Sequence, residues 1–149
     1  MFLREVKESQ VMTRPFSKAL RCLQGVSLRP TRQRLVLAKL LFDDVDRHIT
    51  AESLHHDANQ TGAKVSLATI YNTLHQFVDA GLLKEVIVNS NRTYFDTNVS
   101  DHHHIYLNEE DILQDIPTND LIISSLPGAP EGKKISGVSV VVHMENKQA

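Results

Sequence analysis

A predicted helix that leads directly into a β-hairpin is the feature that most limits how this chain can fold. The segment SLATIYNTLHQFVDAG, residues 66–81, carries apolar residues at helical spacing. Two β-rich runs follow at 82–88 and 92–96, LLKEVIV and RTYFD, on either side of the turn NSN. Helices that end in such a hairpin form the winged variant of the helix-turn-helix unit, whose last helix enters the major groove of DNA.

Further helices are predicted upstream, at 15–25, 31–42 and 50–62, after a loosely ordered arm that runs to about residue 14. Thr31, Thr50 and Ser66 can each begin a helix, because a hydroxyl oxygen accepts a free N–H of the first turn. Gly62 and Gly81 follow the last apolar residues of two of these segments and are expected to end them. The apolar stripe of the last helix consists of Leu67, Ile70, Leu74, Phe77 and Val78.

The polar side of the 66–81 helix differs from an ordinary solvated surface. It carries neither Glu nor Lys, and its first acidic residue is Asp79. Its residues are Ala68, Thr69, Tyr71, Asn72, His75 and Gln76. Small hydrogen-bonding groups around one tyrosine favour a face that touches a partner, and an ordinary exposed face is the alternative.

The pattern changes to short β-rich segments after residue 97. HHHIYL at 102–107, DILQDI at 111–116 and ISGVSVVVHM at 135–144 are predicted to be strands. PTNDLIISSL at 117–126 is predicted to be a short helix that begins at Pro117.

The chain is therefore predicted to be an α+β protein of two domains. An N-terminal winged helix-turn-helix DNA-binding domain is expected at 1–97, and a small C-terminal α/β dimerisation domain at 98–149. Because a module of about 50 residues buries little core alone, a second copy is expected to complete it in a homodimer. The apolar candidates for that interface are Ile105, Leu107, Leu113, Ile116, Leu121, Ile122, Val138, Val140 and Val142.

Charge and composition narrow the class of protein. Residues 1–97 hold 13 Lys and Arg against 10 Asp and Glu, whereas residues 98–149 hold 3 against 8. Basic charge in the first part suits a DNA-binding domain, and chance asymmetry is the alternative. No apolar run reaches the roughly 18 residues of a membrane span, and the start lacks the apolar core of a signal peptide. A cytoplasmic protein with no membrane partner is expected.

Sequence motifs give little support for an enzyme. The chain contains no HExxH, no HxE…PCxxC and no GxSxG. Its single cysteine, Cys22, excludes a disulfide within the chain and a Cys₄ zinc site. A small His-rich metalloenzyme is thus the least favoured hypothesis, and a metal-storage protein would leave the winged helix unexplained. We expect that the chain is not an enzyme.

Three consecutive histidines, His102, His103 and His104, stand between an acidic segment and an apolar one. In a strand, successive side chains point to opposite faces. His102 and His104 would then share one face, and His103 would point the other way. Imidazoles are common ligands of metals and of heme iron.

Five motifs in order resemble the ferric uptake regulator family of winged-helix repressors. They are G…LRPTRQR at 25–34, HITAESL at 48–54, SLATIYNTLHQFVDAGLL at 66–83, RTYFD at 92–96 and HHHIYL at 102–107. The run YNTLHQF…GLL…TYFDTN…HHH, without any CxxC, is most similar to the iron response regulator branch of α-proteobacteria. This resemblance implies an iron- or heme-responsive regulator that binds AT-rich operator DNA as a dimer and controls heme synthesis and iron homeostasis genes. The alternative within the family is a regulator that senses another divalent metal or peroxide.

The resemblance also implies a metal site between the two domains. The family takes one His before the third helix, an acid at the end of the wing and two His from the next strand. The matching residues are His48, Asp96, His102 and His104. Three imidazoles and one carboxylate suit Fe²⁺, Mn²⁺ or Zn²⁺.

DNA contacts and a heme site follow from the same resemblance. Tyr71 is expected to pack on a thymine methyl group, and Asn72, where the family usually has arginine, suits adenine. Ser66, Ala68 and Thr69 are expected close to the backbone or bases of double-stranded DNA. Arg29 matches the basic residue that enters the adjacent minor groove. The heme ligands implied are His102, His103 and His104, with a solvent-facing His103 as the alternative.

Overall fold

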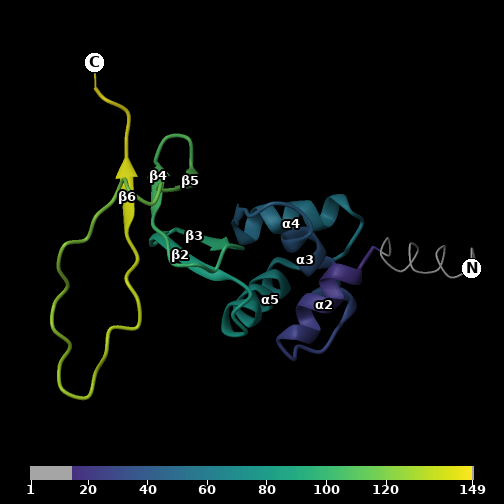
Figure 1. Ribbon diagram of the computed structural model, residues 1–149. Coiled ribbons are helices and arrows are strands. Elements are labelled where there is room, and N and C mark those ends of the chain that lie inside the picture. Colours follow the sequence, from purple (N-terminus) through teal and green to yellow (C-terminus); the bar gives the residue numbers. More distant parts are fainter. Residues whose placement is uncertain (1–14, 149) are drawn as a thin grey trace, which may run out of the picture. The chain divides into compact units, whose positions relative to one another are not determined.

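The computed structural model describes residues 15–148, so the expected N-terminal arm lies outside the described residues. The chain divides into two compact units after Val99. The first unit (Figure 1) contains helices α2 (Ser17–Gly25), α3 (Arg32–Phe42), α4 (Ala51–Gln60) and α5 (Leu67–Asp79), and strands β1 (His48–Ile49), β2 (Lys84–Asn89) and β3 (Arg92–Asp96). This is the helix series and hairpin of a winged helix-turn-helix unit, and it confirms the predicted α+β class.

The helix ends are set by the residues predicted to set them. Thr31 and Thr50 begin α3 and α4, and Ser66 begins α5 by accepting the Thr69 N–H at 3.1 Å. Gly62 and Gly81 follow α4 and α5 with φ values of 83° and 82°. A residue with a side chain is strained at such positive φ, and glycine is not, so these two helices end where the glycines stand.

A single apolar core holds the four helices and the wing together. Its fully buried residues include Leu23, Leu37, Leu41, Leu54, Ile70, Leu74, Phe77 and Phe95. One member of the predicted α5 stripe is wrong, because Leu67 is 36% exposed and Thr73 is buried instead. The buried face of α5 is centred on Ile70 and Phe77, and at 100° per residue this face includes Thr73 and leaves Leu67 at its margin.

The wing is a three-stranded antiparallel sheet in the order β1-β3-β2. The predicted hairpin of β2 and β3 is present, with Val86 opposite Tyr94. The sequence did not indicate β1, which has only two residues and pairs with β3. Its register places His48 opposite Asp96 and Ile49 opposite Phe95.

The second unit contains β4 (His104–Leu107), β5 (Ile112–Asp115) and β6 (Val141–Met144) in the order β5-β4-β6. β5 runs antiparallel to β4, and β6 runs parallel to it. Three side chains of this sheet are buried, those of His104, Tyr106 and Leu113. The small core agrees with the expectation for so short a module.

Two predictions for the second unit are wrong: the helix at 117–126 is absent, and the strand at 135–144 is shorter than expected. Residues 117–126 form one turn, closed by the Asp120 N–H on the Pro117 carbonyl at 2.9 Å, and no helix. Residues 121–126 bury no apolar stripe, and a short helix without tertiary packing is marginal. The strand expected at 135–144 forms only at Val141–Met144, because its partner β4 begins at His104, opposite Val141.

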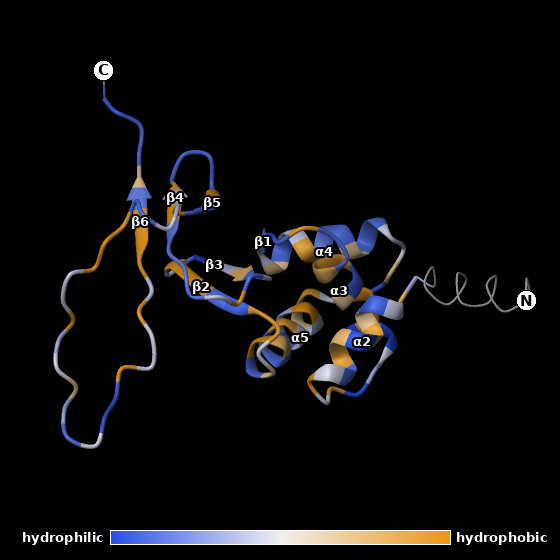
Figure 2. Ribbon diagram, viewed as in Figure 1, coloured by the Kyte–Doolittle hydropathy of each residue, from blue (hydrophilic) through white to orange (hydrophobic). Residues whose placement is uncertain are grey.

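The irregular segment between β5 and β6 contains several hydrophobic residues, coloured orange in Figure 2. Five of its apolar side chains are exposed to solvent. They are Ile122, Ile123, Leu126, Ile135 and Val138, with exposed fractions of 40% to 84%. Among the described residues, no helix is long and apolar enough to cross a membrane.

Candidate metal-binding residues and DNA-binding surface

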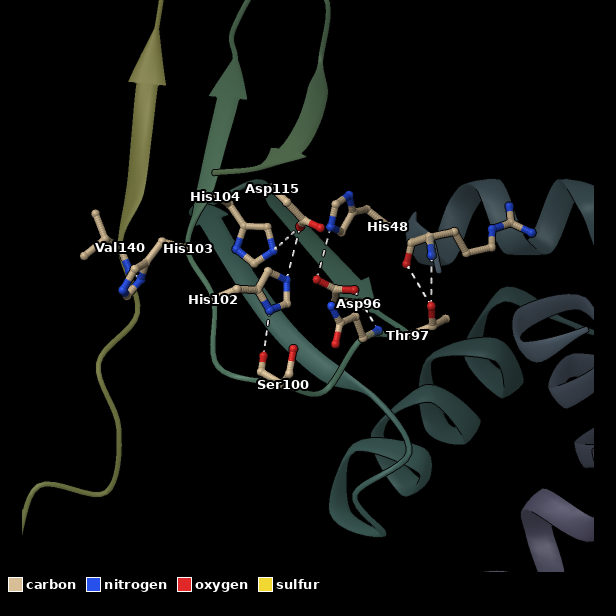
Figure 3. A network of polar contacts seen from close by, with 11 residues as sticks. His48, Asp96, Thr97, Ser100, His102, His103, His104, Asp115 and Val140 are labelled. Carbon is tan, nitrogen blue, oxygen red and sulfur yellow. Dashed lines mark hydrogen bonds and ion pairs between the residues drawn. The ribbon is translucent and has the colours of Figure 1, made fainter. Parts of the chain in front are cut away.

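A histidine and a carboxylate of the first unit meet at one end of the wing. His48 Nε2 lies 3.1 Å from Asp96 Oδ2, and the Asp96 side chain is 1% exposed (Figure 3). The second carboxylate oxygen, Oδ1, accepts the Asn98 N–H at 2.9 Å. Asp96 is thus held in place by one oxygen and directs the other at an imidazole nitrogen.

Hydrogen bonds of the neighbouring residues Arg47 and Thr97 hold this histidine and carboxylate close together. The Arg47 N–H donates to Thr97 Oγ1 at 2.9 Å, and the Thr97 N–H donates to the Arg47 carbonyl at 3.1 Å. The Arg47 guanidinium donates to the Leu40 carbonyl at 3.1 Å and contacts Asp57 at 3.2 Å. These contacts tie β1 to α3, α4 and the end of β3, so His48 is positioned by three elements.

In the second unit, two histidines converge on one aspartate. Asp115 Oδ1 lies 3.1 Å from His102 Nε2 and 3.4 Å from His104 Nε2 (Figure 3). The two rings are 4.5 Å apart, as expected for histidines on one face, although His102 precedes the strand. The register of β4 and β5, which places His104 opposite Asp115, brings in the carboxylate.

Hydrogen bonding of His102 shows which of its nitrogens is available to a cation. His102 Nδ1 lies 2.6 Å from the Ser100 carbonyl oxygen. A carbonyl only accepts, so Nδ1 carries the proton, and a neutral ring then presents the Nε2 lone pair toward Asp115. A lone pair and a carboxylate oxygen 3.1 Å apart need a cation between them, either a proton or a metal ion. Metal-bound histidines usually have this outer hydrogen bond to a carbonyl, so the group fits a divalent metal.

His103 faces the opposite side of the strand and is engaged there. Its Nδ1 accepts the Val140 N–H at 3.1 Å, just before β6 (Figure 3). The His104 N–H donates to the Val140 carbonyl at 3.0 Å. His103 therefore helps to join β6 to β4, and a neutral His103 in this arrangement carries its proton on Nε2.

The polar face of α5 includes a tyrosine whose hydroxyl and ring both contact other side chains. The Tyr71 hydroxyl donates to Glu52 Oε1 of α4 at 2.7 Å, and its ring stacks on His75 with centroids 6.5 Å apart. This hydrogen bond lowers the pKa of Glu52 and raises the pKa of Tyr71. The ring itself is 36% exposed, so its edge remains open to a partner.

The other predicted DNA-contact residues divide into two kinds. Ala68, Asn72 and Arg29 are exposed, as a direct contact with DNA requires. Ser66 and Thr69 bond to each other, since the Ser66 hydroxyl donates to Thr69 Oγ1 at 2.9 Å and accepts the Thr69 N–H. Their side chains have a structural role at the start of α5.

The structure groups the predicted metal ligands in pairs, His48 with Asp96 in the first unit and His102 with His104 in the second. Sequence reasoning missed Asp115 and Glu52. Asp115 could have been found from the hairpin, because two four-residue strands around residues 108–111 place residue 104 opposite residue 115. No signal in the sequence pointed to Glu52.

A winged helix-turn-helix unit followed by a small domain with a convergent His and Asp group defines a DNA-binding regulator that responds to a metal. The model of the ferric uptake regulator family matches residues 25–125. The chain therefore belongs to the ferric uptake regulator family, whose members are metal-responsive transcription regulators and not enzymes. Regulators of this family bind DNA and act as dimers.

Individual relatives agree with this family. The peroxide-responsive repressor PerR of Staphylococcus aureus is 29% identical over 98 residues, which is 66% of this chain. The match likewise spans 66% of the relative, just under two thirds of its length. The ferric uptake regulator of Pseudomonas aeruginosa with manganese is 20% identical, with 87% of this chain and 98% of that chain covered and a TM-score of 0.66. The Vibrio cholerae ferric uptake regulator is 18% identical, with 85% and 98% covered and a TM-score of 0.67. The structural matches establish the fold.

Proposed function

We propose that this chain is an iron- and heme-responsive regulator of the iron response regulator type, which binds AT-rich operator DNA as a homodimer. The observation that carries the metal response is His102, whose Nδ1–H donates to a backbone carbonyl while Nε2 is directed at a carboxylate oxygen. That pattern is typical of a histidine prepared for a metal ion. The domain that reads DNA is 1–97, and the domain that dimerises and senses is 98–149.

We propose that one divalent ion binds His48, Asp96, His102 and His104, with Asp115 as a further ligand or an outer partner. Within each unit these side chains already converge through Nε2 and carboxylate oxygens. Asp96 and His102 are six residues apart, and six extended residues span at most about 20 Å. A bound ion supplies the cross-link between the two domains, and the donor set of three imidazoles and carboxylates suits Fe²⁺, Mn²⁺ or Zn²⁺.

The DNA contacts proposed for α5 involve its exposed face. Asn72 would pair with adenine in the major groove, and the held ring of Tyr71 would contact a thymine methyl group. Arg29 would enter the adjacent minor groove, and Ala68 leaves room for the close approach of the backbone. Ser66, which caps α5, and Thr69, its hydrogen-bond partner, would direct the remaining N–H groups of the first turn toward a phosphate.

Homodimerisation is supported by the second unit. Among its described residues, only three side chains are buried, whereas the segment between β5 and β6 exposes apolar residues such as Ile122. A second copy that covers this segment would complete the missing core. Two α5 helices related by a two-fold axis would then read a roughly palindromic operator.

Heme is proposed to bind at His102, His103 and His104. A cavity of about 370 Å³ in the second unit is lined by His102 and His103 together with Ile116, Pro117, Leu121 and Val138. This volume lies in the range of small-molecule sites. If His103 held heme iron through Nε2, that nitrogen would have to lose its proton and the Val140 N–H would have to find another acceptor. Heme binding at His103 should thus loosen β6.

Optical titration with hemin tests that proposal. His103→Ala should weaken the heme absorbance change that wild type gives, and His143→Ala, a change in an exposed β6 histidine, should not. Identical spectra in wild type and a triple His102/His103/His104→Ala variant would show that heme does not bind at these histidines.

A peroxide response is the second candidate. It is favoured by the relatives named peroxide-responsive repressors. The two responses separate in one experiment, in which the metal-loaded protein on DNA is treated with hemin or with hydrogen peroxide. Release by peroxide alone favours the second candidate, and release by hemin alone favours the first.

Gel-shift titration on an AT-rich promoter duplex tests the function itself. Binding should require Mn²⁺ or Fe²⁺, should be lost when a chelator is added, and should return when the metal is restored. Binding that is equally tight with and without the metal would show that the metal does not control DNA affinity.

A further inference from the structure

Arg34, in the first turn of α3, makes three side-chain hydrogen bonds to two separate parts of the first unit. Its Nη1–H donates to the Arg29 carbonyl at 2.9 Å. Its Nε–H and Nη2–H both donate to Gln76 Oε1 of α5, at 3.2 and 2.9 Å. One guanidinium thus connects the loop before α3 to the exposed face of the predicted recognition helix.

The loop that carries Arg29 is held from both ends. On the α2 side, the Leu28 N–H donates to the Leu23 carbonyl at 2.9 Å. On the α3 side, Thr31 Oγ1 accepts the backbone N–H of Arg34 at 3.2 Å. The Arg34 side chain adds a third restraint at the Arg29 carbonyl, while Arg29 itself remains exposed.

We infer that Arg34 is a positioning residue for DNA binding, which fixes the minor-groove residue Arg29 at a set distance from the major-groove helix α5. This inference rests on the proposed DNA contacts of Arg29 and α5. Two elements that enter adjacent grooves must match the spacing of those grooves. A rigid link between them lowers the conformational entropy lost on binding. Arg34 supplies that link through the Arg29 carbonyl on one side and Gln76 on the other.

Arginine suits this task and lysine does not. A guanidinium presents several N–H groups in one fixed plane, whereas an ammonium is a point charge on a flexible stem. Arg34→Lys therefore keeps the positive charge and loses the geometry. Because Gln76 is exposed, its bonds with Arg34 contribute little to folding, and the main effect of Arg34→Lys should be on DNA affinity.

A phosphate contact by Arg34 is the competing explanation. In that case Arg34→Lys would keep most of the affinity, because lysine also neutralises a phosphate. Arg34→Gln would lower the slope of log affinity against log salt concentration by about 1. If Arg34 is a positioning residue, Arg34→Lys weakens binding, because lysine does not hold both the Arg29 carbonyl and Gln76.

The test is a double-mutant cycle on the full-length, metal-loaded protein. Fluorescence anisotropy measures affinity for a duplex that the wild-type protein selects from a random library. The variants are Arg34→Lys, Gln76→Ala, Arg29→Ala and the double variant Arg29→Ala/Arg34→Lys, with Arg21→Lys on the exposed side of α2 as the matched control. Thermal melting checks that each variant folds, and Gln76→Ala probes the same link without removing a charge.

Arg34→Lys and Gln76→Ala should each weaken binding about tenfold, and Arg21→Lys should leave it within about twofold. Adding Arg34→Lys to Arg29→Ala should cause no further loss, because the residue to be positioned is already absent. Additive losses, or wild-type affinity for Arg34→Lys while Arg29→Ala binds weakly, would overturn the positioning role and leave the proposed function intact. Wild-type affinity for Arg29→Ala would overturn the minor-groove contact itself and the inference with it.

Discussion

His48 Nε2 and Asp96 Oδ2 lie 3.1 Å apart, on residues that face each other across the antiparallel strands β1 and β3. The pair joins the first residue of β1, the strand that leads into α4, to the last residue of β3. Because Asp96 is 1% exposed and its other oxygen accepts the Asn98 N–H, the carboxylate has little freedom to turn away. Any ion that binds this pair acts on both the helix series and the wing.

Asp115 should contribute to metal affinity although it follows the histidine run by eleven residues. Asp115→Ala removes the oxygen on which His102 and His104 converge. We expect Mn²⁺ or Zn²⁺ affinity to fall about 10- to 100-fold, as for other partners of metal ligands. Isothermal titration calorimetry measures the loss, and Glu110→Ala in the exposed hairpin turn is the control. Equal affinities for both variants would exclude Asp115 from the site.

Tyr71 should titrate at higher pH than an ordinary tyrosine. The Glu52 carboxylate accepts its hydroxyl hydrogen and so raises the pKa of Tyr71, while the same bond lowers the pKa of Glu52. Stabilisation by ionised Glu52 is present above its unfolded pKa and is lost as pH falls through its lowered folded pKa.

Ultraviolet difference titration of wild type against Tyr71→Phe isolates the Tyr71 signal. Glu52→Ala should move the Tyr71 midpoint down toward the ordinary value. A midpoint that does not change in Glu52→Ala would contradict the role assigned to this hydrogen bond.

Asn72 should specify one base pair. Asn72→Ala removes the amide that is proposed to pair with adenine, so discrimination at one A·T position should fall by about 1–3 kcal/mol. Affinity is measured on a set of duplexes that each change one position, and Gln60→Ala at the exposed end of α4 is the control. A loss spread evenly over all duplexes would show that Asn72 contacts only the DNA backbone.

Ile122 should lie in the dimer interface. It is 84% exposed in the isolated chain, and a charge placed in an apolar interface is costly. Analytical ultracentrifugation at micromolar concentration should find wild type as a dimer and Ile122→Asp shifted toward monomer. Val45→Asp is the matched control, because Val45 is 83% exposed on a loop of the first unit. A stable wild-type monomer would contradict the dimer.

Local signals in the sequence were sufficient for the winged helix. Thr31, Thr50 and Ser66 cap helices, and Gly62 and Gly81 end them, because these effects depend on one or two neighbouring residues. The hairpin of β2 and β3 was equally predictable from two β-rich runs around a short polar turn.

Features that depend on distant pairing were missed. β1 has two residues and exists because β3, more than forty residues later, offers it an edge. The helix expected at 117–126 is absent because no part of the chain within residues 15–148 covers Ile122, Ile123 and Leu126, which a sequence pattern does not reveal. Asp115 was also missed, although its position opposite His104 follows from the register of the β4–β5 hairpin and could have been predicted.

We propose that one ion is shared by His48 and Asp96 of the first unit and His102 and His104 of the second. Isothermal titration with Mn²⁺ tests it on wild type, His48→Ala, His102→Ala and the control His56→Ala, an exposed residue of α4. We predict one Mn²⁺ per wild-type chain, the same ion weakened at least about 100-fold by either His48→Ala or His102→Ala, and no change in His56→Ala. Two ions per wild-type chain, of which each variant loses a different one, would contradict the claim.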